Sequence, residues 1–363
     1  MRLLFVGTGC GGGGTESHFA SLASAMAGAG HEVAAVVRPG EHIYRELASA
    51  GGVRLYAGRF DRNNDPAGAA SLWRAVRHFR PDWVVASFKR EYLSASLAAR
   101  AHGAGTAFFK HIVNMHPASV RLIPRLADRF IVPSEYLRDE LVRRGAPARR
   151  LRVLPNPVDL RRFAPNAALR ACTRAELGVG SDEVLIGFVG RLEAGKGIHE
   201  YAQALDLAME RSASLRALWV GDGEAAALLL ERIWRSPHRD RHSHLGWLAD
   251  VRSSYAAMDL LALPSIGPET FGRASIEAQA AGVPVLASRN GGIPETLADG
   301  ETGLLLPAGD APAWAEAIVR LAQDGPARAR MGAAGRDFVQ AHFCQRRIAA
   351  DFERLLNDER APA

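Results

Sequence analysis

The sequence contains no long apolar run, although 48% of its 363 residues are hydrophobic. The first apolar stretch ends at Val6, in a glycine tract, and none approaches the roughly 20 residues that a membrane-spanning helix needs. We therefore expect neither a signal peptide nor a transmembrane helix, and a cytoplasmic location. A hydrophobic fraction this high excludes a disordered chain, and the length suggests two domains.

Cysteine is nearly absent. Cys10, Cys172 and Cys344 are the only three and lie far apart, so neither a disulfide framework nor a zinc site is expected. The histidines at 238, 242 and 244 have no supporting Cys or carboxylate at a rigid spacing, and we interpret them as part of a solvated loop. The cysteines and these histidines therefore predict no metal site.

Lysine is scarce too, because Lys89, Lys110 and Lys196 are the only lysines among 45 Lys and Arg residues. Residues 1–170 carry 25 Lys and Arg against 13 Asp and Glu, a net charge of +12, whereas residues 171–363 carry 20 against 26, a net charge of −6. A basic half indicates an anionic partner, although a solvated arginine-rich face gives the same count. No nucleic-acid-binding motif or aromatic platform accompanies the charge, so we expect no nucleic-acid partner.

Short apolar runs alternate with helical patterns, such as residues 19–29 and 71–79, along the whole chain. This alternation predicts an α/β protein with buried parallel sheets. A proline-containing segment, 155–180, interrupts the alternation and is interpreted as a linker. We therefore predict two Rossmann-like domains, residues 1–160 and 161–344, facing each other across a cleft. The predicted strands are 3–6, 33–37, 53–56, 83–86, 107–109, 130–132 and 152–154, then 184–189, 215–220, 244–245, 260–263, 283–287 and 303–305.

A glycine tract follows the first predicted strand. Gly7, Gly9 and Gly12 form the pattern G-x-G-x-x-G, which is typical of dinucleotide binding. The second strand leads into Arg38 rather than an acidic residue, so an NADP-dependent oxidoreductase remains an alternative. The run 11–14 is longer than the fingerprint requires and indicates a close backbone approach or a mobile loop.

Two glutamates flank a predicted helix start in the second domain. A strand ends at Pro264, the next loop carries Glu269, and the helix that begins near Gly272 carries Glu277. Free amides at a helix N terminus favour a phosphate, and a glycine there allows close approach. Carboxylates beside a phosphate are suited to accept hydrogen bonds from hydroxyls. A nucleotide sugar has hydroxyls on both sides of its diphosphate, so the pattern favours such a ligand over solvated surface charge.

Arg191 and Lys196 lie in a glycine-containing loop after the first strand of the second domain. Two cations at the carboxyl end of a strand are suited to neutralise a diphosphate. The loop is not a Walker loop, because the order G-x-x-x-x-G-K-[ST] is absent.

Together these motifs resemble those of the retaining glycosyltransferases of family 4, which have the GT-B fold, and the likeness runs nearly from end to end. The last matching motif is the Glu-x7-Glu signature, and it is the most specific. The resemblance implies that the C-terminal helix, within 345–363, packs back on the N-terminal domain. The matching segments are 13–16, 30–33, 130–134, 154–159, 190–192, 196–197, 221–223 and 269–277.

The resemblance implies roles for the charged residues. Arg191 and Lys196 would hold the diphosphate, Glu277 would bind the nucleotide ribose, and Glu269 would bind hydroxyls of the transferred sugar. His111, after a strand of the first domain, would lie beside the donor sugar, with His116 as the competing assignment.

It also implies backbone contacts to the donor. The amides at 271 and 272 would lie near the phosphate and sugar, 245–247 would hold the base, and 13–16 would line the cleft from the N-terminal side. The residues concerned are Phe271, Gly272, Leu245, Gly246, Trp247, Gly13, Gly14 and Glu16.

The implied reaction is transfer of a hexose or related sugar from a nucleoside diphosphate sugar to an acceptor hydroxyl, with retention and without a metal or other bound cofactor. The implied acceptor is a glycan or a lipid-linked molecule, in the synthesis of a bacterial cell-surface glycan, lipopolysaccharide or exopolysaccharide, or of a glycolipid. A GT-B sugar epimerase remains an alternative beside the oxidoreductase. We expect the basic half to meet an anionic glycan, or the inner face of the cytoplasmic membrane as a peripheral protein, through the arginines at 74, 77, 80, 121, 125 and 129.

Overall fold

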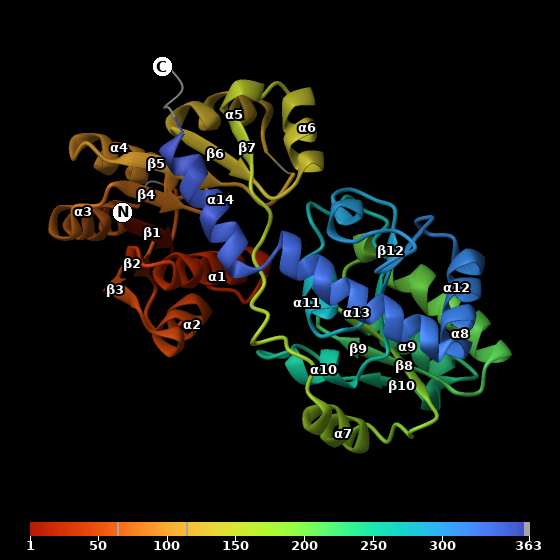
Figure 1. Cartoon of the computed structure of the whole chain (residues 1–363). Helices are drawn as coiled ribbons and strands as arrows, with labels where there is room; N and C mark the ends of the chain where they lie inside the picture. Colours follow the sequence, from red (N-terminus) through yellow and green to blue (C-terminus); the bar gives the residue numbers. More distant parts are fainter. Residues whose placement is uncertain (64, 114, 359–363) are drawn as a thin grey trace. The chain divides into compact units, whose positions relative to one another are not determined.

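The structure, a computed structural model, describes residues 1–63, 65–113 and 115–358 (Figure 1). The chain forms two compact units, each built around one parallel sheet. The first comprises Met1–Pro157 and the segment that starts at Cys344, and the second comprises Val158–Phe343. Two helix-covered parallel sheets confirm the predicted fold class.

The sheet of the first unit has the strand order β3-β2-β1-β4-β5-β6-β7. The chain runs outward from β1 to β3 and then returns to β4, on the other side of β1, so β1 and β4 form the topological switch point. Ligands of such sheets bind at the carboxyl ends of the strands beside this point. The strands are β1 (Arg2–Gly7), β2 (Glu32–Val37), β3 (Val53–Ala57), β4 (Trp83–Ala86), β5 (Gly105–Phe109), β6 (Arg129–Val132) and β7 (Leu151–Val153).

Alternate residues of these strands point to opposite faces, and each face is covered by helices. Leu3 and Phe5 of β1 pack with α1, α2 and α14, whereas Leu4 and Val6 pack with α3, α4 and α6. The helices are α1 (Gly14–Gly28), α2 (His42–Ala50), α3 (Pro66–Phe79), α4 (Tyr92–Ala101), α5 (Pro117–Leu122), α6 (Glu135–Arg143) and α14 (Gln345–Asn357), with short 3-10 turns at Ile123–Leu126 and Ala148–Arg150.

Helix α14 completes the first unit although it follows the second unit in the chain, as the fold class predicts. Ile348, Phe352 and Leu356 are buried in the same cluster as Phe5 and Phe109, and Figure 1 shows α14 in blue against α1 in red. Each such side chain contributes about 1.5–3 kcal/mol when it is fully buried.

Arg129 anchors the far end of α14. Its Nε donates to the carbonyl of Leu355 at 2.7 Å, and its Nη2 donates to the carbonyl of Asp358. The expectation that Arg129 belongs to an exposed basic surface is therefore wrong, since its side chain is buried. A guanidinium is well suited to this place, because the last carbonyls of a helix have no intrahelical donor.

The sheet of the second unit has the order β10-β9-β8-β11-β12-β13, with its switch point between β8 and β11. Its strands are β8 (Val184–Val189), β9 (Leu215–Val220), β10 (His242–His244), β11 (Leu260–Leu263), β12 (Val285–Ser288) and β13 (Gly303–Leu306). Its helices are α7 (Ala167–Glu176), α8 (Ile198–Arg211), α9 (Ala226–Arg235), α10 (Arg252–Ala257), α11 (Arg273–Ala280), α12 (Ala311–Gln323) and α13 (Gly325–His342), with 3-10 turns at Ala194–Lys196, Arg239–Arg241 and Ile293–Thr296.

The histidines interpreted as a solvated loop include the edge strand β10, so that interpretation is wrong. His242 is half-buried, and its Nδ1 accepts a hydrogen bond from Nε1 of Trp219 at 3.1 Å. Burial lowers the pKa of His242 to about 4, so the ring is neutral at physiological pH. Within the described residues, no three His, Cys, Asp or Glu side chains are grouped to hold a metal ion.

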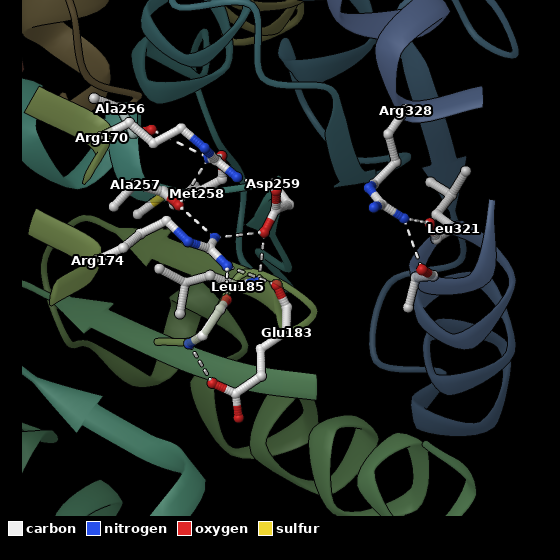
Figure 2. A network of polar contacts seen from close by, with 12 residues as sticks. Arg170, Arg174, Glu183, Leu185, Ala256, Ala257, Met258, Asp259, Leu321 and Arg328 are labelled. Carbon is white, nitrogen blue, oxygen red and sulfur yellow. Dashed lines mark hydrogen bonds and ion pairs between the residues drawn. The ribbon is translucent and has the colours of Figure 1, made fainter. Parts of the chain in front are cut away.

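The segment interpreted as a linker contains α7, which is fastened to the second unit (Figure 2). Arg170 and Arg174 pair with the Asp259 carboxylate at 2.6 and 2.9 Å, and both also donate to backbone carbonyls before β11. The same carboxylate accepts from the Leu185 amide of β8 at 2.8 Å. The linker between the two units therefore ends before α7, which belongs to the second unit.

All three cysteines are free. Among the helices that the structure describes, none is both long and apolar enough to cross a bilayer.

Candidate functional site

Lys196 and Glu269 meet at the switch point of the second sheet. Lys196 ends the 3-10 turn after β8, and Glu269 lies in the loop after β11. The Lys196 Nζ donates to Oε2 of Glu269, and the two side chains are only 24% and 18% exposed. The sequence assigned these residues to different parts of a ligand, whereas the structure brings them together as one ion pair.

The backbone holds the two loops together. The carbonyl of Gly195 accepts from the amides of Ile266 and Gly267, at 3.1 and 2.7 Å. Asn290 donates through Nδ2 to the carbonyls of Ser265 and Gly267, at 3.1 and 2.6 Å. Sequence reasoning missed Asn290, whose only signal is its position two residues after β12. These hydrogen bonds thus hold together the two loops that carry the ion pair.

The chain around Glu269 needs glycine at two positions. Gly291 has φ +60°, and a Cβ there would lie 2.1 Å from the Glu269 carbonyl oxygen. Gly272 has φ +93° and forms the N-cap of α11. Both conformations strain residues with a side chain. The glycines therefore fix the turn that carries Glu269 into α11.

The N terminus of α11 lies directly after the turn that carries Glu269. No side chain in the described part of the chain caps it, and the Phe271 ring is buried edge-on against Phe343, 5.8 Å away, which holds the turn in place. The first amides of a helix lack intrahelical acceptors and lie at the positive end of its dipole. The amides after Gly272 are therefore suited to an anion.

Glu277 lies on α11, nearly buried, with two polar neighbours. Its Oε1 accepts from Nε of Arg273 at 2.6 Å, and its Oε2 accepts from the Tyr255 hydroxyl at 3.1 Å. Burial, and then the charge of Glu277, raise the pKa of Tyr255 well above its usual value, so the phenol remains a donor. A carboxylate offers about four lone-pair positions, which leaves capacity for ligand hydroxyls. Sequence reasoning missed both neighbours.

Arg191 is held less firmly than Lys196. Its side chain is 73% exposed and pairs with Glu193, from Nη1 to Oε1 at 2.6 Å. An exposed pair of this kind contributes at most about 1 kcal/mol, so the guanidinium exchanges partners readily. The structure does not bring Arg191 to Glu269 or Glu277.

The loop after β10 presents apolar side chains beside a fixed backbone. Leu245 and Trp247 are exposed, and the Gly246 carbonyl accepts from the Gly221 amide at 2.7 Å. The Nε2 of His244 lies 3.0 Å from the Gly221 carbonyl oxygen. The carboxyl ends of β9 and β10 are therefore tied together, and an indole face is available for stacking.

In the first unit the glycine tract lies at the carboxyl end of β1. Gly13 is the exposed N-cap of α1, which begins at Gly14, and no described side chain caps it. The Glu16 carboxylate folds back over the tract, so that a Cβ on Gly9 would lie 2.6 Å from its Oε1. Gly13, Gly14 and Glu16 are thus neighbours, as their sequence proximity requires.

Packing accounts for the first glycines of the dinucleotide-like pattern. A Cβ on Gly7 would lie 2.4 Å from the Phe19 ring, and one on Gly9 would contact the Phe88 ring as well as Glu16. Arg38, the residue that would receive a ribose phosphate, pairs with Asp61 at 2.6 Å. Packing therefore explains these glycines without a bound dinucleotide.

The two candidate histidines of the first unit have different surroundings. The His111 ring lies 4.4 Å from the buried His18 ring of α1 and is stacked on Phe109. His116 is exposed, and its Nδ1 accepts from the Ala118 amide at 3.3 Å as the N-cap of α5. The structure thus gives His116 a capping role and associates His111 with the glycine-tract helix.

Two protein families match this chain. Residues 12–162 match the family described as Glycosyltransferase Family 4, and residues 183–324 match the family described as Glycosyl transferases group 1. The two matches cover most of the chain, one in each unit.

A D-inositol 3-phosphate glycosyltransferase of Saccharomonospora viridis is 34% identical over 226 residues, which are 59% of this chain and 52% of that protein. The chain thus spans about half the length of the curated relatives it matches. The crystal structure of Anabaena HepE in complex with UDP and glucose has a TM-score of 0.85 at 21% identity, over 99% of this chain and 100% of that one. The lipopolysaccharide outer core galactosyltransferase WaaB has a TM-score of 0.69 at 16% identity, over 98% of both chains. These two likenesses show the fold.

Proposed function

This chain belongs to glycosyltransferase family 4, and we propose that it transfers a sugar from a nucleoside diphosphate sugar to an acceptor hydroxyl. The observation that carries the proposal is the Lys196–Glu269 pair beside the uncapped N terminus of α11. A cation and helix amides suit a diphosphate, and carboxylates suit hydroxyls. A nucleotide sugar requires both kinds of contact. The UDP and glucose bound by HepE, and the glycosyltransferase names of the relatives, support the same ligand class.

The charged residues act on the donor. Lys196, the amides after Gly272 and a recruited Arg191 stabilise the charge that develops on the leaving diphosphate. Glu269 accepts hydrogen bonds from the transferred sugar, and Glu277 accepts them from the ribose. We propose that the reaction proceeds without a metal, because Lys196 and the helix amides already meet the leaving charge. We also propose that it proceeds with retention, as in the retaining glycosyltransferases that the motifs of this chain resemble. In a front-face displacement the leaving phosphate takes the proton of the acceptor hydroxyl.

The exposed loops supply the remaining contacts. We assign the base to 245–247, where backbone and the Trp247 face are available. The tract at 13–16 and His111, both at the carboxyl edge of the first sheet, are assigned to the sugar and acceptor side.

For the acceptor, we propose an anionic glycan or lipid-linked molecule of cell-surface glycan or glycolipid synthesis. The net charge of +12 over residues 1–170 supports it, as do the phosphate-bearing substrate named for the inositol phosphate relatives and the name of WaaB.

A peripheral position on the inner face of the cytoplasmic membrane is part of the proposal. Helices α3 and α4 pack together and expose large apolar side chains next to arginines. Apolar side chains flanked by cations are typical of a surface that lies on anionic lipid. We define this α3–α4 face by Trp73, Leu93, Leu97, Arg74, Arg77 and Arg100.

The test is a thermal-shift panel of UDP, GDP, ADP, their sugars and NADPH. We expect one nucleoside diphosphate and its sugar to stabilise the protein, and Glu277→Ala to abolish that shift. A shift with NADPH alone would overturn the proposal in favour of an oxidoreductase. Release of an altered sugar without any acceptor would instead identify an epimerase.

A further inference from the structure

Glu91 is a fully buried carboxylate at the switch point of the first sheet. It precedes α4 and lies in the β4–α4 connection. Its Oε1 accepts from both the amide and the hydroxyl of Thr8, at 2.8 and 2.7 Å. Thr8 is the first residue after β1, so the contact joins the loops that follow β1 and β4.

Thr8 is held through every polar group it has. Besides the two bonds to Glu91, its carbonyl accepts from Nη2 of Arg90 at 2.6 Å, and its Oγ accepts from the Phe60 amide at 3.3 Å. The glycine loop, residues 9–13, follows Thr8 and ends at the N-cap of α1. Buried Phe19 fixes α1 in the core. Thr8 therefore anchors the β1 end of the glycine loop, and two of its bonds depend on the titratable Glu91.

The contact does not by itself require a carboxylate, since a glutamine carbonyl would accept the same two bonds. Oε2 of Glu91 is buried and has no hydrogen-bond partner in the described part of the chain. Burial raises the pKa of Glu91 to about 7, against the hydrogen bonds of Thr8 and the charge of Arg90. An ionisable side chain thus occupies a buried position in which an uncharged side chain would destabilise the folded state less.

We propose that Glu91 is a positioning residue, which sets the glycine loop 9–13 through Thr8 and loosens it on taking up a proton. A carboxylate accepts roughly twice as strongly as a neutral acid, so proton uptake weakens both bonds to Thr8. The loop opening meant here leaves Glu91 buried, so it differs from global unfolding, which exposes Glu91 and which proton uptake opposes. The other titratable or charged groups of the surrounding elements are Lys89, Arg90 and Tyr92 beside Glu91, Cys10 and Glu16 at the loop, Arg38 after β2, Arg59, Asp61 and Asp65 after β3, and Lys110 after β5. The assignment of this loop to the sugar and acceptor side rests on the proposed function, whereas the positioning role of Glu91 does not.

The same sheet contains a matched control at its opposite edge. Thr106, near the start of β5, donates from its amide and hydroxyl to one oxygen of Asp128, at 2.8 and 3.0 Å. This pair repeats the chemistry of Thr8 and Glu91 at the amino ends of the strands, away from the glycine loop.

Hydrogen exchange of the full chain tests the proposal, read on a peptide that covers residues 9–14 from about pH 6 to about pH 8.5 and corrected for the intrinsic rate. In the wild type we expect protection to rise with pH, and in Glu91→Gln we expect it to stay flat. Thr8→Val should speed exchange about five- to tenfold, as for the loss of one hydrogen bond. Thr8→Ser, which keeps the hydroxyl, should exchange as slowly as the wild type. Thr106→Val should leave the exchange rate of this peptide unchanged.

Equal pH profiles in the wild type and Glu91→Gln would overturn the proposal, as would an effect of Thr106→Val equal to that of Thr8→Val. The Thr8 variants keep the test decisive if Glu91→Gln does not fold. Thermal shift with UDP on the same proteins separates the two proposals. If UDP, GDP and ADP all fail to bind the wild type, the proposed function fails while the exchange result still decides the role of Glu91.

Discussion

Lys196 and Glu269, 73 residues apart in the chain, form an ion pair that bridges the loops after β8 and β11. The first unit contains the same kind of bridge, from Thr8 to Glu91, between the loops after β1 and β4. In each sheet a side-chain contact thus joins the two loops at the switch point, and in both the acceptor is a glutamate.

Lys196→Ala should lower the transfer rate by about 10²–10³, because it removes a fixed cation from the leaving diphosphate. Initial rates with the donor identified by thermal shift measure this loss. The matched control is Arg235→Ala, which breaks an exposed helix pair with Glu231 and should leave the rate unchanged. Equal losses in the two variants would argue against the role of Lys196.

Tyr255→Phe should weaken binding of a nucleoside diphosphate about tenfold, because Glu277 loses a buried donor that orients its carboxylate. Inorganic pyrophosphate, which has no ribose, should bind both proteins equally well. Calorimetry with the two ligands checks the prediction. A parallel loss for pyrophosphate would place Glu277 at the phosphates instead.

Glu91→Gln should change how stability depends on pH. The folded pKa of Glu91 is about 7, against an ordinary value of 4.5, so the folded state keeps a proton that the unfolded state has lost between these values. Wild-type stability therefore falls as pH rises through this window, by on the order of 2–3 kcal/mol, and the glutamine variant lacks this fall. Urea unfolding at about pH 5 and pH 8 measures it, and parallel curves would refute it.

Arg129→Ala should destabilise the first unit by about 3 kcal/mol, because the variant leaves buried helix carbonyls without a donor. Arg125→Ala, a nearby exposed arginine, should have no measurable effect. Thermal melts followed by circular dichroism compare the two. An unchanged melt of the Arg129 variant would mean that burial of Phe352 and its neighbours holds α14 alone.

Charge reversal of the α3–α4 face should abolish sedimentation with anionic vesicles. The triple change of Arg74, Arg77 and Arg100 to Glu removes three cations, each worth about 1 kcal/mol near an anionic surface. A control reverses the exposed arginines of the second unit at 211, 235 and 320. Equal binding by both variants, or no binding by the wild type, would eliminate a membrane role for this face.

The local sequence predicted the strands well, because most short apolar runs of a βα repeat form buried strands. All thirteen predicted strands overlap strands of the two sheets. The smallest overlap is at β10, which shares only His244 with its prediction. Helix α1 begins at Gly14, five residues before the predicted start, since glycines carry little helical signal.

The candidate residues were found by motif, but their partners were not. Glu277 follows from its spacing to Glu269. Arg273 lies inside the same signature but had no predicted role, and Tyr255 lies in a segment with no distinguishing pattern. Arg129 and His242 were misread for one reason: polar residues in a strand look exposed until the sheet shows what covers them.

The route of α14 sets an order for folding during synthesis. The second unit is one continuous stretch, Val158–Phe343, and has all of its strands and helices once that stretch has left the ribosome. The first unit begins earlier but still lacks the helix that covers Phe109 and receives Arg129. The half of the protein that is translated first is therefore the half that is finished last, and its apolar face stays open while the other half folds.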